Sequence, residues 1–405
     1  MKKFVLGHRC KKLFLIEACF EEADGDIIMD EEETNHGDFK ELPEISLHAI
    51  LGAYASETMR VRGGIGHIST TVLVDSGSTH NFMSEVLAKK VGLQLENGGR
   101  FEVIVASGET LSSPVERFAP ETAPASTEPS DGFKSKDVTI DRSKPITARI
   151  FLPDNPEPVG DLPVLVYFHG GAFCFGSTTW LGYHQFLGDL SVASQSIVFS
   201  VDYRLAPENR LPIAFDDCFA SLEWLSHKAN SDPWLERADL SRVFLSGDSC
   251  GGNIAHHVAI RTIQSKVCHV KIKGLLPVHP YFGTEKRTER EMTDGATGDV
   301  KLTDALWRLS LPEGSNRDYY GSNFEMAELS EVEWSEFPAV VVQVAGLDFL
   351  KERGVMYAEF LHKKGVKEVK LVEAEGESHV YHMIHPKSEA TRVLQKQISE
   401  FIHSF

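Results

Sequence analysis

Six short apolar runs, separated by stretches with helical periodicity, constrain the fold of the chain from about residue 136 onward. Each run has the length of one strand and is largely apolar, which is typical of strands buried on both faces of a sheet. The runs cover residues 162–171, 195–203, 241–249, 271–280, 338–346 and 366–374. Between them lie amphipathic patterns such as residues 214–229, where Phe215, Phe219 and Leu222 share one helical face. This alternation predicts an α/β fold with a mostly parallel central sheet covered by helices.

Composition limits the partners of the chain. Of its 405 residues, 42% are hydrophobic and 25% are charged, as in an ordinary globular protein. A formal net charge of -18 argues against a nucleic-acid partner, because phosphate binding needs a basic surface. Six scattered cysteines without a C-x-x-C pair favour a reducing compartment. Since no signal peptide or membrane-spanning run is present in the sequence, we expect no membrane partner and a cytoplasmic location.

The chain divides by composition into three parts. Residues 1–43 include the acidic stretch 21–40 and are expected to form a flexible N-terminal segment. Residues 44–112 alternate as β-strands do and form a small β-rich unit. Residues 113–405 open with a surface connection rich in Pro, Ser, Thr and Glu and then carry the α/β pattern.

A candidate nucleophile lies at the end of the third apolar run. Gly247 and Gly251 flank Ser249 in the pattern G-x-S-x-G, with the apolar residues 243–245 before it and a helical pattern after it. This strand–turn–helix context is the one in which such a serine is exposed at the edge of a sheet, because the glycines allow a sharp turn. Ser249 is therefore the predicted nucleophile.

A serine hydroxyl needs a base to take its proton and an acid to orient that base. Asp348 directly follows the fifth apolar run, and His379 follows the sixth. Because active-site loops gather at the carboxyl ends of parallel strands, both residues are expected near Ser249. His382 and His385 compete for the role of the base, but they fit the opening of a C-terminal helical segment better.

The intermediate of acyl transfer also needs hydrogen-bond donors for its negatively charged oxygen. The sequence His-Gly-Gly-Ala at 169–172 follows the first apolar run and matches the HGGG type of loop. We expect the backbone N–H groups of Gly171 and Ala172 to form this oxyanion hole, with Gly170 shaping the turn or contributing. The N–H of Cys250 would be the third donor, and its side chain is expected to be an inert buried thiol.

Residues 113–405 resemble the plant carboxylesterase family of hormone-sensitive-lipase-like α/β hydrolases. The matching stretches are HGGAFCFGS (169–177), VDYRLAPENRLPIAFDD (201–217), GDSCGGNIAHH (247–257), HPYFG (279–283), AGLDFLKERG (345–354) and GESHVYH (376–382). The resemblance implies a Ser249, Asp348 and His379 triad, an acyl-enzyme intermediate without metal or organic cofactor, and small-molecule ester substrates. Retention of His379 argues against the gibberellin-receptor-like members, which have lost this histidine.

Two alternatives to ester hydrolysis stay open. The sequence is also similar to 2-hydroxyisoflavanone dehydratase-like members, which keep a similar triad and eliminate water. The family's N-terminal lid segment is replaced here by unrelated sequence, which suggests a more open pocket, a less stable fold or a catalytically impaired ligand-binding fusion protein. The sequence does not indicate an oligomeric state.

Residues 44–112 resemble the retropepsin-like protease region of Ty3/gypsy-type plant retroelements, with Asp75 in the stretch LVDSGSTHNF (73–82). The resemblance ends after residue 111, before the second half of a retropepsin, so Asp75 is interpreted as vestigial and aspartic protease activity is not expected. Residues 7–17 resemble the end of a zinc knuckle. His8 and Cys10 supply at most two of four zinc ligands, so no metal site is expected.

Overall fold

The computed structural model describes residues 121–156, 160–229, 231–265, 270–293 and 298–405, and the course of six strands before residue 120. The chain divides into two compact units. One comprises Met1–Pro120 with Thr297–Leu302, and the other comprises Glu121–Ala296 with Thr303–Phe405. Strand β6 (Thr110–Ala119) crosses the boundary that the sequence predicts after residue 112, and the division falls behind this strand.

The first unit contains two small sheets. One has the strand order β2-β3-β1-β4, and β5 pairs with β6 in the other. The strands are β1 (Leu13–Glu17), β2 (Met59–Ile65), β3 (Ile68–Asp75), β4 (His80–Met83) and β5 (Gln94–Ile104). Asp75 is the last residue of β3, but residues 76–79 after it, like His8 and Cys10, lie outside the described residues. The retropepsin resemblance therefore stays a prediction.

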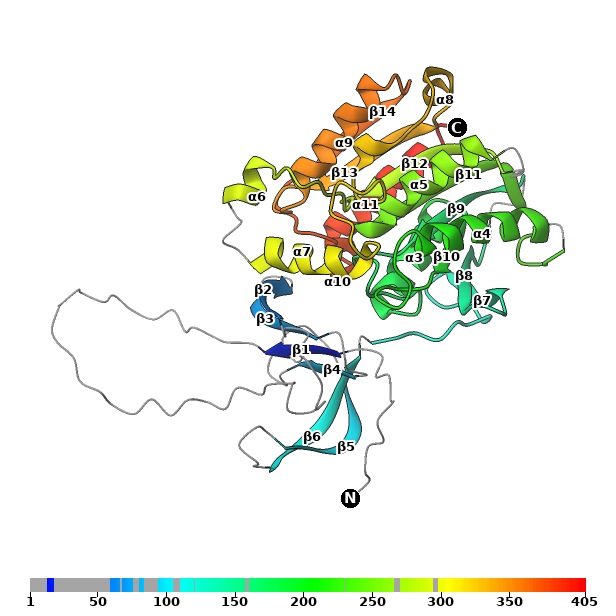
Figure 1. Cartoon of the computed structure of the whole chain (residues 1–405). Coiled ribbons are helices and arrows are strands. Elements are labelled where there is room, and N and C mark those ends of the chain that lie inside the picture. Colours follow the sequence, from blue (N-terminus) through cyan, green and yellow to red (C-terminus); the bar gives the residue numbers. More distant parts are fainter. Residues whose placement is uncertain are drawn as a thin grey trace. The chain divides into compact units, whose positions relative to one another are not determined.

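An eight-stranded sheet with the order β14-β13-β12-β11-β9-β10-β8-β7 forms the centre of the second unit (Figure 1). All six apolar runs form strands, as the sequence predicts. They are β9 (Leu162–Phe168), β10 (Ile197–Asp202), β11 (Ala238–Asp248), β12 (Ile272–Val278), β13 (Ala339–Ala345) and β14 (Val369–Ala374). Each is parallel to its neighbours among the six. The antiparallel strands β7 (Phe133–Asp141) and β8 (Ile146–Pro153) extend the sheet beyond β10.

Helices cover both faces of this sheet. The helices of the described chain are α3 (Leu181–Ala193), α4 (Ile213–Lys228), α5 (Cys250–Gln264), α6 (Glu289–Thr293), α7 (Gly298–Ser310), α8 (Glu331–Ser335), α9 (Lys351–Lys363), α10 (Tyr381–Ile384) and α11 (Glu389–Ile402), with a 3₁₀ turn at Phe324–Met326; of these, α3, α4, α5 and α9 pack on the strands. Val198 of β10 packs in the apolar cluster that α3 and α11 supply, whereas the next residue, Phe199, stacks on Trp224 of α4. Since neighbouring strand residues face opposite sides, α3 and α4 cover opposite faces.

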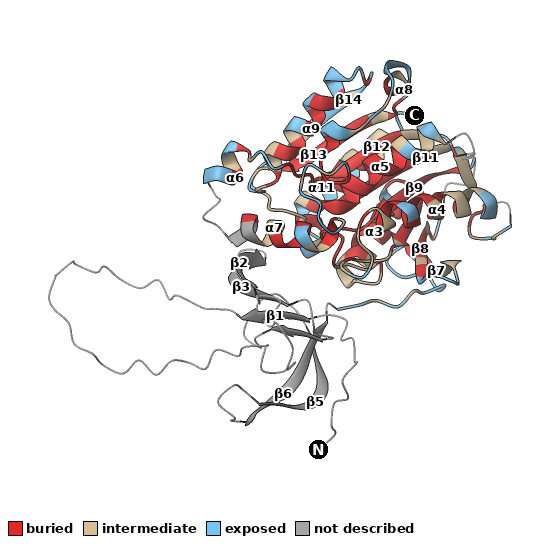
Figure 2. Ribbon diagram, in the orientation of Figure 1, coloured by how far each residue is buried: buried red, intermediate tan, exposed pale blue. Residues whose placement is uncertain are grey.

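The core of the second unit lies between these layers. Buried residues line the central strands and the inward faces of the helices (Figure 2). Each large apolar side chain that is fully buried contributes about 1.5–3 kcal/mol, so this layering stabilises the carboxyl edge of the sheet on which the candidate site is built. Within the described residues, no helix combines the length and the apolar composition needed to cross a bilayer.

Candidate active site

Ser249 stands in a sharp turn between β11 and α5. Its backbone has φ 54° and ψ -120°, a left-handed conformation that a residue with a side chain rarely adopts. A Cβ on Gly251 would overlap the carbonyl oxygen of Phe168, so only glycine lets α5 begin this close to β9. The strand–turn–helix that the sequence predicts is therefore formed, and Ser249 lies in its turn, between the end of β11 and the start of α5.

Asp348 and His379 meet at the carboxyl ends of two adjacent strands. Asp348 follows β13, His379 follows β14, and His379 Nδ1 lies 2.7 Å from Asp348 Oδ2. The other carboxylate oxygen accepts a hydrogen bond from the Leu350 N–H at 2.9 Å. Burial raises the pKa of Asp348, but the charge and hydrogen bond of His379 outweigh it and the pKa lies below its ordinary value. Asp348 is thus held as a carboxylate that orients His379.

The two competing histidines occupy other places. His382 lies in α10 and is fully buried, with its ring 4.6 Å from that of Phe186 and its Nε2 3.4 Å from the Tyr167 hydroxyl. Burial lowers the pKa of His382 to about 3, so its ring is neutral. His385 is the residue at which α10 ends. The position of His382 agrees with the helical assignment made from the sequence, whereas His385 lies between α10 and α11.

The loop after β9 turns tightly beside Ser249. Gly171, Ala172 and Phe173 follow one another with φ values of 114°, 50° and 63°. A Cβ on Gly171 would overlap the carbonyl oxygen of Phe175, so glycine is needed at this position. The N–H of Phe173 lies 3.1 Å from the sulfur of Cys250, the residue after the nucleophile. This contact brings the loop to the amino end of α5, where an oxyanion hole is required.

The Cys250 side chain is part of this packing. It is fully buried, and burial raises the pKa of its thiol to about 12, although contacts from Tyr203 and from the N–H groups of Phe173 and Ala172 act in the other direction. The thiol therefore stays protonated at neutral pH, as the sequence interpretation of an inert thiol implies.

The expected contribution of Gly170 to the oxyanion hole needs a correction. Its N–H points to the interior, where it donates to the Tyr183 hydroxyl at 2.8 Å and lies 3.1 Å from Asp248 Oδ1. A donor that is already paired with buried oxygens is not directed at a substrate. Of the two roles considered for Gly170, shaping the turn is the one that its contacts allow.

Asp248 anchors a buried network that sequence reasoning missed. Its carboxylate is fully buried and accepts hydrogen bonds from the hydroxyls of Tyr167 at 2.7 Å and Tyr183 at 2.8 Å. Burial raises the pKa of Asp248, while the two tyrosine hydrogen bonds act against this shift. The network joins the residue before Ser249 to Gly170 and fixes both turns of the site relative to each other. Tyr183 lies in α3, far from Asp248 along the chain, so no local pattern indicates the pair.

We expect Tyr183→Phe to lower the free energy of unfolding by about 1–3 kcal/mol, because the change leaves the buried Asp248 oxygen and the Gly170 N–H each short of a partner. Urea unfolding followed by circular dichroism measures this difference. Tyr320→Phe, at a position that is 43% exposed, is the control and should change the value by less than about 0.5 kcal/mol. Equal values for the two variants would contradict the assigned role of the network.

Two other features of the second unit bear on the site. In the described part of the chain, the side chains of His279, Asp348 and His379 form a group with metal-ligand atoms, all within 4.8 Å of one another. The Asp348–His379 hydrogen bond already occupies two of these atoms, so a cation would have to displace the proton on His379 Nδ1.

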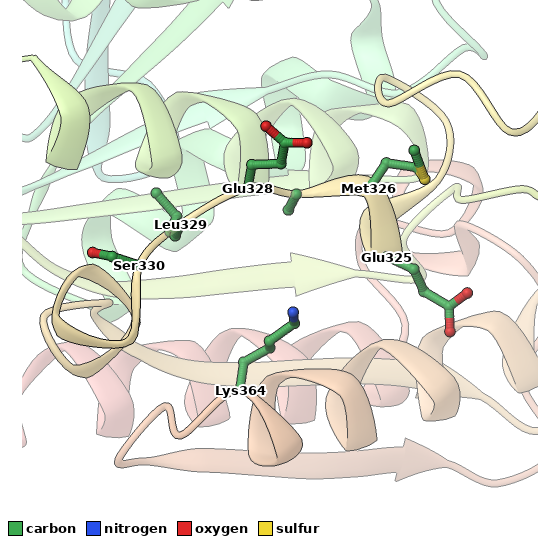
Figure 3. A pocket seen from close by; sticks show the side chains of 7 residues that line it. Glu325, Met326, Glu328, Leu329, Ser330 and Lys364 are labelled. Atoms are coloured by element: carbon green, nitrogen blue, oxygen red, sulfur yellow. The ribbon is translucent and has the colours of Figure 1, made fainter.

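A surface hollow of about 500 Å³ is lined by residues 325–330 and Lys364 (Figure 3). It contains none of the predicted catalytic residues.

Comparison with known proteins identifies the family. A family profile described as "alpha/beta hydrolase fold" matches residues 165–383. "Probable carboxylesterase 6" of Arabidopsis thaliana is 38% identical over 285 residues, covering 68% of this chain and 82% of the relative. "Tuliposide A-converting enzyme 1, chloroplastic" of Tulipa gesneriana is 39% identical over 290 residues, covering 70% of this chain and 71% of the relative. Because the second name includes a plastid location, the cytoplasmic location of this chain stays a prediction.

Solved structures agree with this assignment. The hyperthermophilic esterase from the archaeon Pyrobaculum calidifontis superposes with a TM-score of 0.57 at 28% sequence identity, covering 67% of this chain and 85% of that protein. The chain therefore belongs to the α/β-hydrolase family and is a serine hydrolase of the plant carboxylesterase type.

Proposed function

We propose that this protein hydrolyses small carboxylic esters through a covalent acyl intermediate on Ser249. The observation that carries the proposal is the hydrogen bond between His379 and the buried Asp348, formed at the same edge of the sheet as the turn of Ser249. A relative named as a probable carboxylesterase and a structural relative named as an esterase support the same chemistry.

The proposed mechanism follows from the proton that each group can hold. Because the Asp348 carboxylate can only accept, His379 carries a proton on Nδ1 and leaves Nε2 to accept one. Nε2 takes the proton of Ser249 as its oxygen bonds to the ester carbonyl carbon, and returns it to the leaving alcohol as the ester C–O bond breaks. Water then attacks the acyl-enzyme with the same base, which releases the acid and restores Ser249.

The oxyanion is assigned to backbone donors of two turns. The N–H groups of Gly171 and Ala172 come from the loop after β9, and that of Cys250 comes from the first residue of α5; the Ala172 N–H also contacts the Cys250 sulfur, a weak acceptor. The amino end of a helix also favours a negative charge. Backbone donors fixed by such turns need little rearrangement when charge develops on the substrate oxygen. Gly170 is left out of this set because its N–H is used by Tyr183 and Asp248.

Hydrolysis of p-nitrophenyl acetate by the purified full chain tests the proposal. We expect an initial burst of p-nitrophenolate, equal to the number of active sites, if deacylation is slower than acylation. The proposal fails if the protein binds the ester without releasing p-nitrophenolate, which is the result expected of an impaired ligand-binding protein. Dehydration of a 2-hydroxyisoflavanone without ester cleavage would favour the lyase alternative instead.

We also propose that residues 44–112 are a truncated retropepsin-like fragment without proteolytic activity. The support is the retropepsin-like sequence around Asp75 and its end after residue 111. A retropepsin needs two complete halves to bring two carboxylates together. Incubation with an unstructured peptide should therefore give no cleavage. Cleavage that is lost in Asp75→Asn would refute this proposal.

A further inference from the structure

The four residues Val278–Tyr281, which begin with the last residue of β12, are hydrogen-bonded to the backbone N–H and the backbone carbonyl of the nucleophile. The carbonyl oxygen of Val278 accepts a hydrogen bond from the Ser249 N–H at 2.9 Å. The N–H of Tyr281 donates to the carbonyl oxygen of Ser249, also at 2.9 Å. The left-handed turn of Ser249 is thus fixed by this neighbouring segment as well as by its own glycines.

His279, inside the same segment, forms hydrogen bonds with the chain segments that contain or lead to the other two triad residues. Its N–H donates to the carbonyl oxygen of Gln343 at 2.8 Å, on strand β13, which leads to Asp348. Its ring Nδ1 lies 3.1 Å from the backbone nitrogen of Val380, the residue after His379. One short segment therefore makes hydrogen bonds to all three parts of the chain that bring the triad together.

The side-chain bond defines the protonation state of His279. A backbone N–H can only donate, so Nδ1 must accept and the ring proton must lie on Nε2. His279 is 2% exposed, and burial lowers its pKa to about 3, despite the opposing charges of Asp348 and Asp248. His382 and His379 lower it further. The ring is therefore neutral at the pH of ester hydrolysis, and the acceptor is retained.

Several residues around the triad have a strained backbone, and the hydrogen bond from the Val380 N–H to His279 stabilises one of them. Seven non-glycine residues in the described part of the chain have a left-handed backbone, and five of them belong to the site: Ala172, Phe173, Ser249, His279 and Val380. Such conformations are energetically unfavourable and persist where surrounding contacts fix them. Val380 has φ 49°, and its N–H donates a hydrogen bond to the ring of His279, which helps to fix this conformation.

We propose that His279 is a positioning residue for the triad, which holds the turn of His379 and Val380 so that the imidazole of His379 stays between Asp348 and Ser249. This inference rests on the proposed esterase function. It is supported by the packing of the His279 ring, whose centroid lies 5.9 Å from that of His379 and 5.5 Å from that of Tyr381. A ring nitrogen of His279 also lies within 4.8 Å of ligand atoms of Asp348 and His379.

A matched pair of substitutions separates this role from simple packing. Asn and Gly both accept the left-handed backbone of residue 279, but only Asn offers an oxygen near the position of Nδ1. In His279→Gly we expect kcat for p-nitrophenyl acetate to fall about 10- to 100-fold with KM within about 2-fold, because misplacement of a catalytic group by about 1 Å has an effect of this size. His279→Asn should keep kcat within about 3-fold of the original protein.

The controls identify which idea fails. All rates are divided by the number of active sites from the burst, and urea unfolding shows that each variant is folded. His256→Asn alters another buried histidine, which contacts the Tyr357 hydroxyl, and should lower stability without changing kcat per site. If His279→Gly does not fold, His279→Ala replaces it, and a loss of more than about 10-fold in His279→Asn alone still overturns the proposal.

Two further results would overturn the positioning role. One is an unchanged kcat in His279→Gly, and the other is an equal loss in His279→Gly and His279→Asn. Ser249→Ala is measured in parallel. If Ser249→Ala keeps full activity, the proposed function is wrong whatever His279 does. If Ser249→Ala is inactive while His279→Gly has the original kcat, only the positioning role is wrong.

Discussion

Ser249→Ala is expected to lower kcat for p-nitrophenyl acetate by at least about 10⁴-fold, which corresponds to about 5–6 kcal/mol of transition-state stabilisation. The change removes the oxygen that forms the acyl bond and leaves its backbone N–H and carbonyl contacts to Val278 and Tyr281 in place. Some residual rate should remain, because oxyanion donors stabilise attack by water as well. Steady-state rates and the loss of the burst measure the effect.

Ser246→Ala is the matched control, since Ser246 is a buried serine on the same strand, β11, and donates to the carbonyl oxygen of Leu276 at 2.8 Å. It should lose about 1 kcal/mol of stability and keep its kcat. A serine-directed phosphonate should add to the original protein and to Ser246→Ala, with the adduct on Ser249 by mass spectrometry. A Ser249→Ala protein that keeps more than about a tenth of the original kcat is incompatible with the proposed nucleophile.

The parts of the fold that the sequence predicted are those with a local pattern. Strands β9 to β13 contain apolar runs that are buried on both faces, whereas the edge strand β14 carries Lys370 and Glu373 and is partly exposed. The turn of Ser249 could be predicted because its glycines, strand and helix are consecutive. Asp348 and His379 followed from the rule that parallel strands place their carboxyl ends at one edge.

The hairpin of β7 and β8 was not predicted as part of the sheet. In β7 only Phe133 and Ser135 are buried, and every other residue of the strand is partly or fully exposed. Its neighbour β8 pairs antiparallel with β10, and such an addition at one edge of a sheet depends on tertiary contacts. Periodicity alone does not contain this information.

Contacts that join distant segments were also missed. The bond from Val380 to the His279 ring joins residues 101 apart in sequence, and the bond from Gly170 to Asp248 joins residues 78 apart. The local sequence around each partner indicates only a common feature, such as a polar residue after a strand or a glycine in a turn, and gives no sign of the distant contact. Only the folded chain shows that Gly170 donates inward, which is why its expected role in the oxyanion hole was only partly right.

Asp348→Asn is expected to lower kcat by about 10³- to 10⁴-fold while the protein stays folded, because the substitution changes the tautomer of His379. Both oxygens of Asp348 act as acceptors, one for the His379 Nδ1–H and the other for the Leu350 N–H. An asparagine amide has only one oxygen, so only one of these two donors can keep its acceptor. The rate of p-nitrophenyl acetate hydrolysis at saturating ester measures the result.

The orientation of the new amide decides what is lost. If its NH₂ group faced Leu350, two donors would meet in a buried place, at a cost of about 1–3 kcal/mol. The amide oxygen therefore stays with Leu350, and the NH₂ group donates to Nδ1 of His379. That contact moves the ring proton to Nε2, the atom that must accept the proton of Ser249. A variant with kcat within about 10-fold of the original would mean that Asp348 does not set the tautomer of His379.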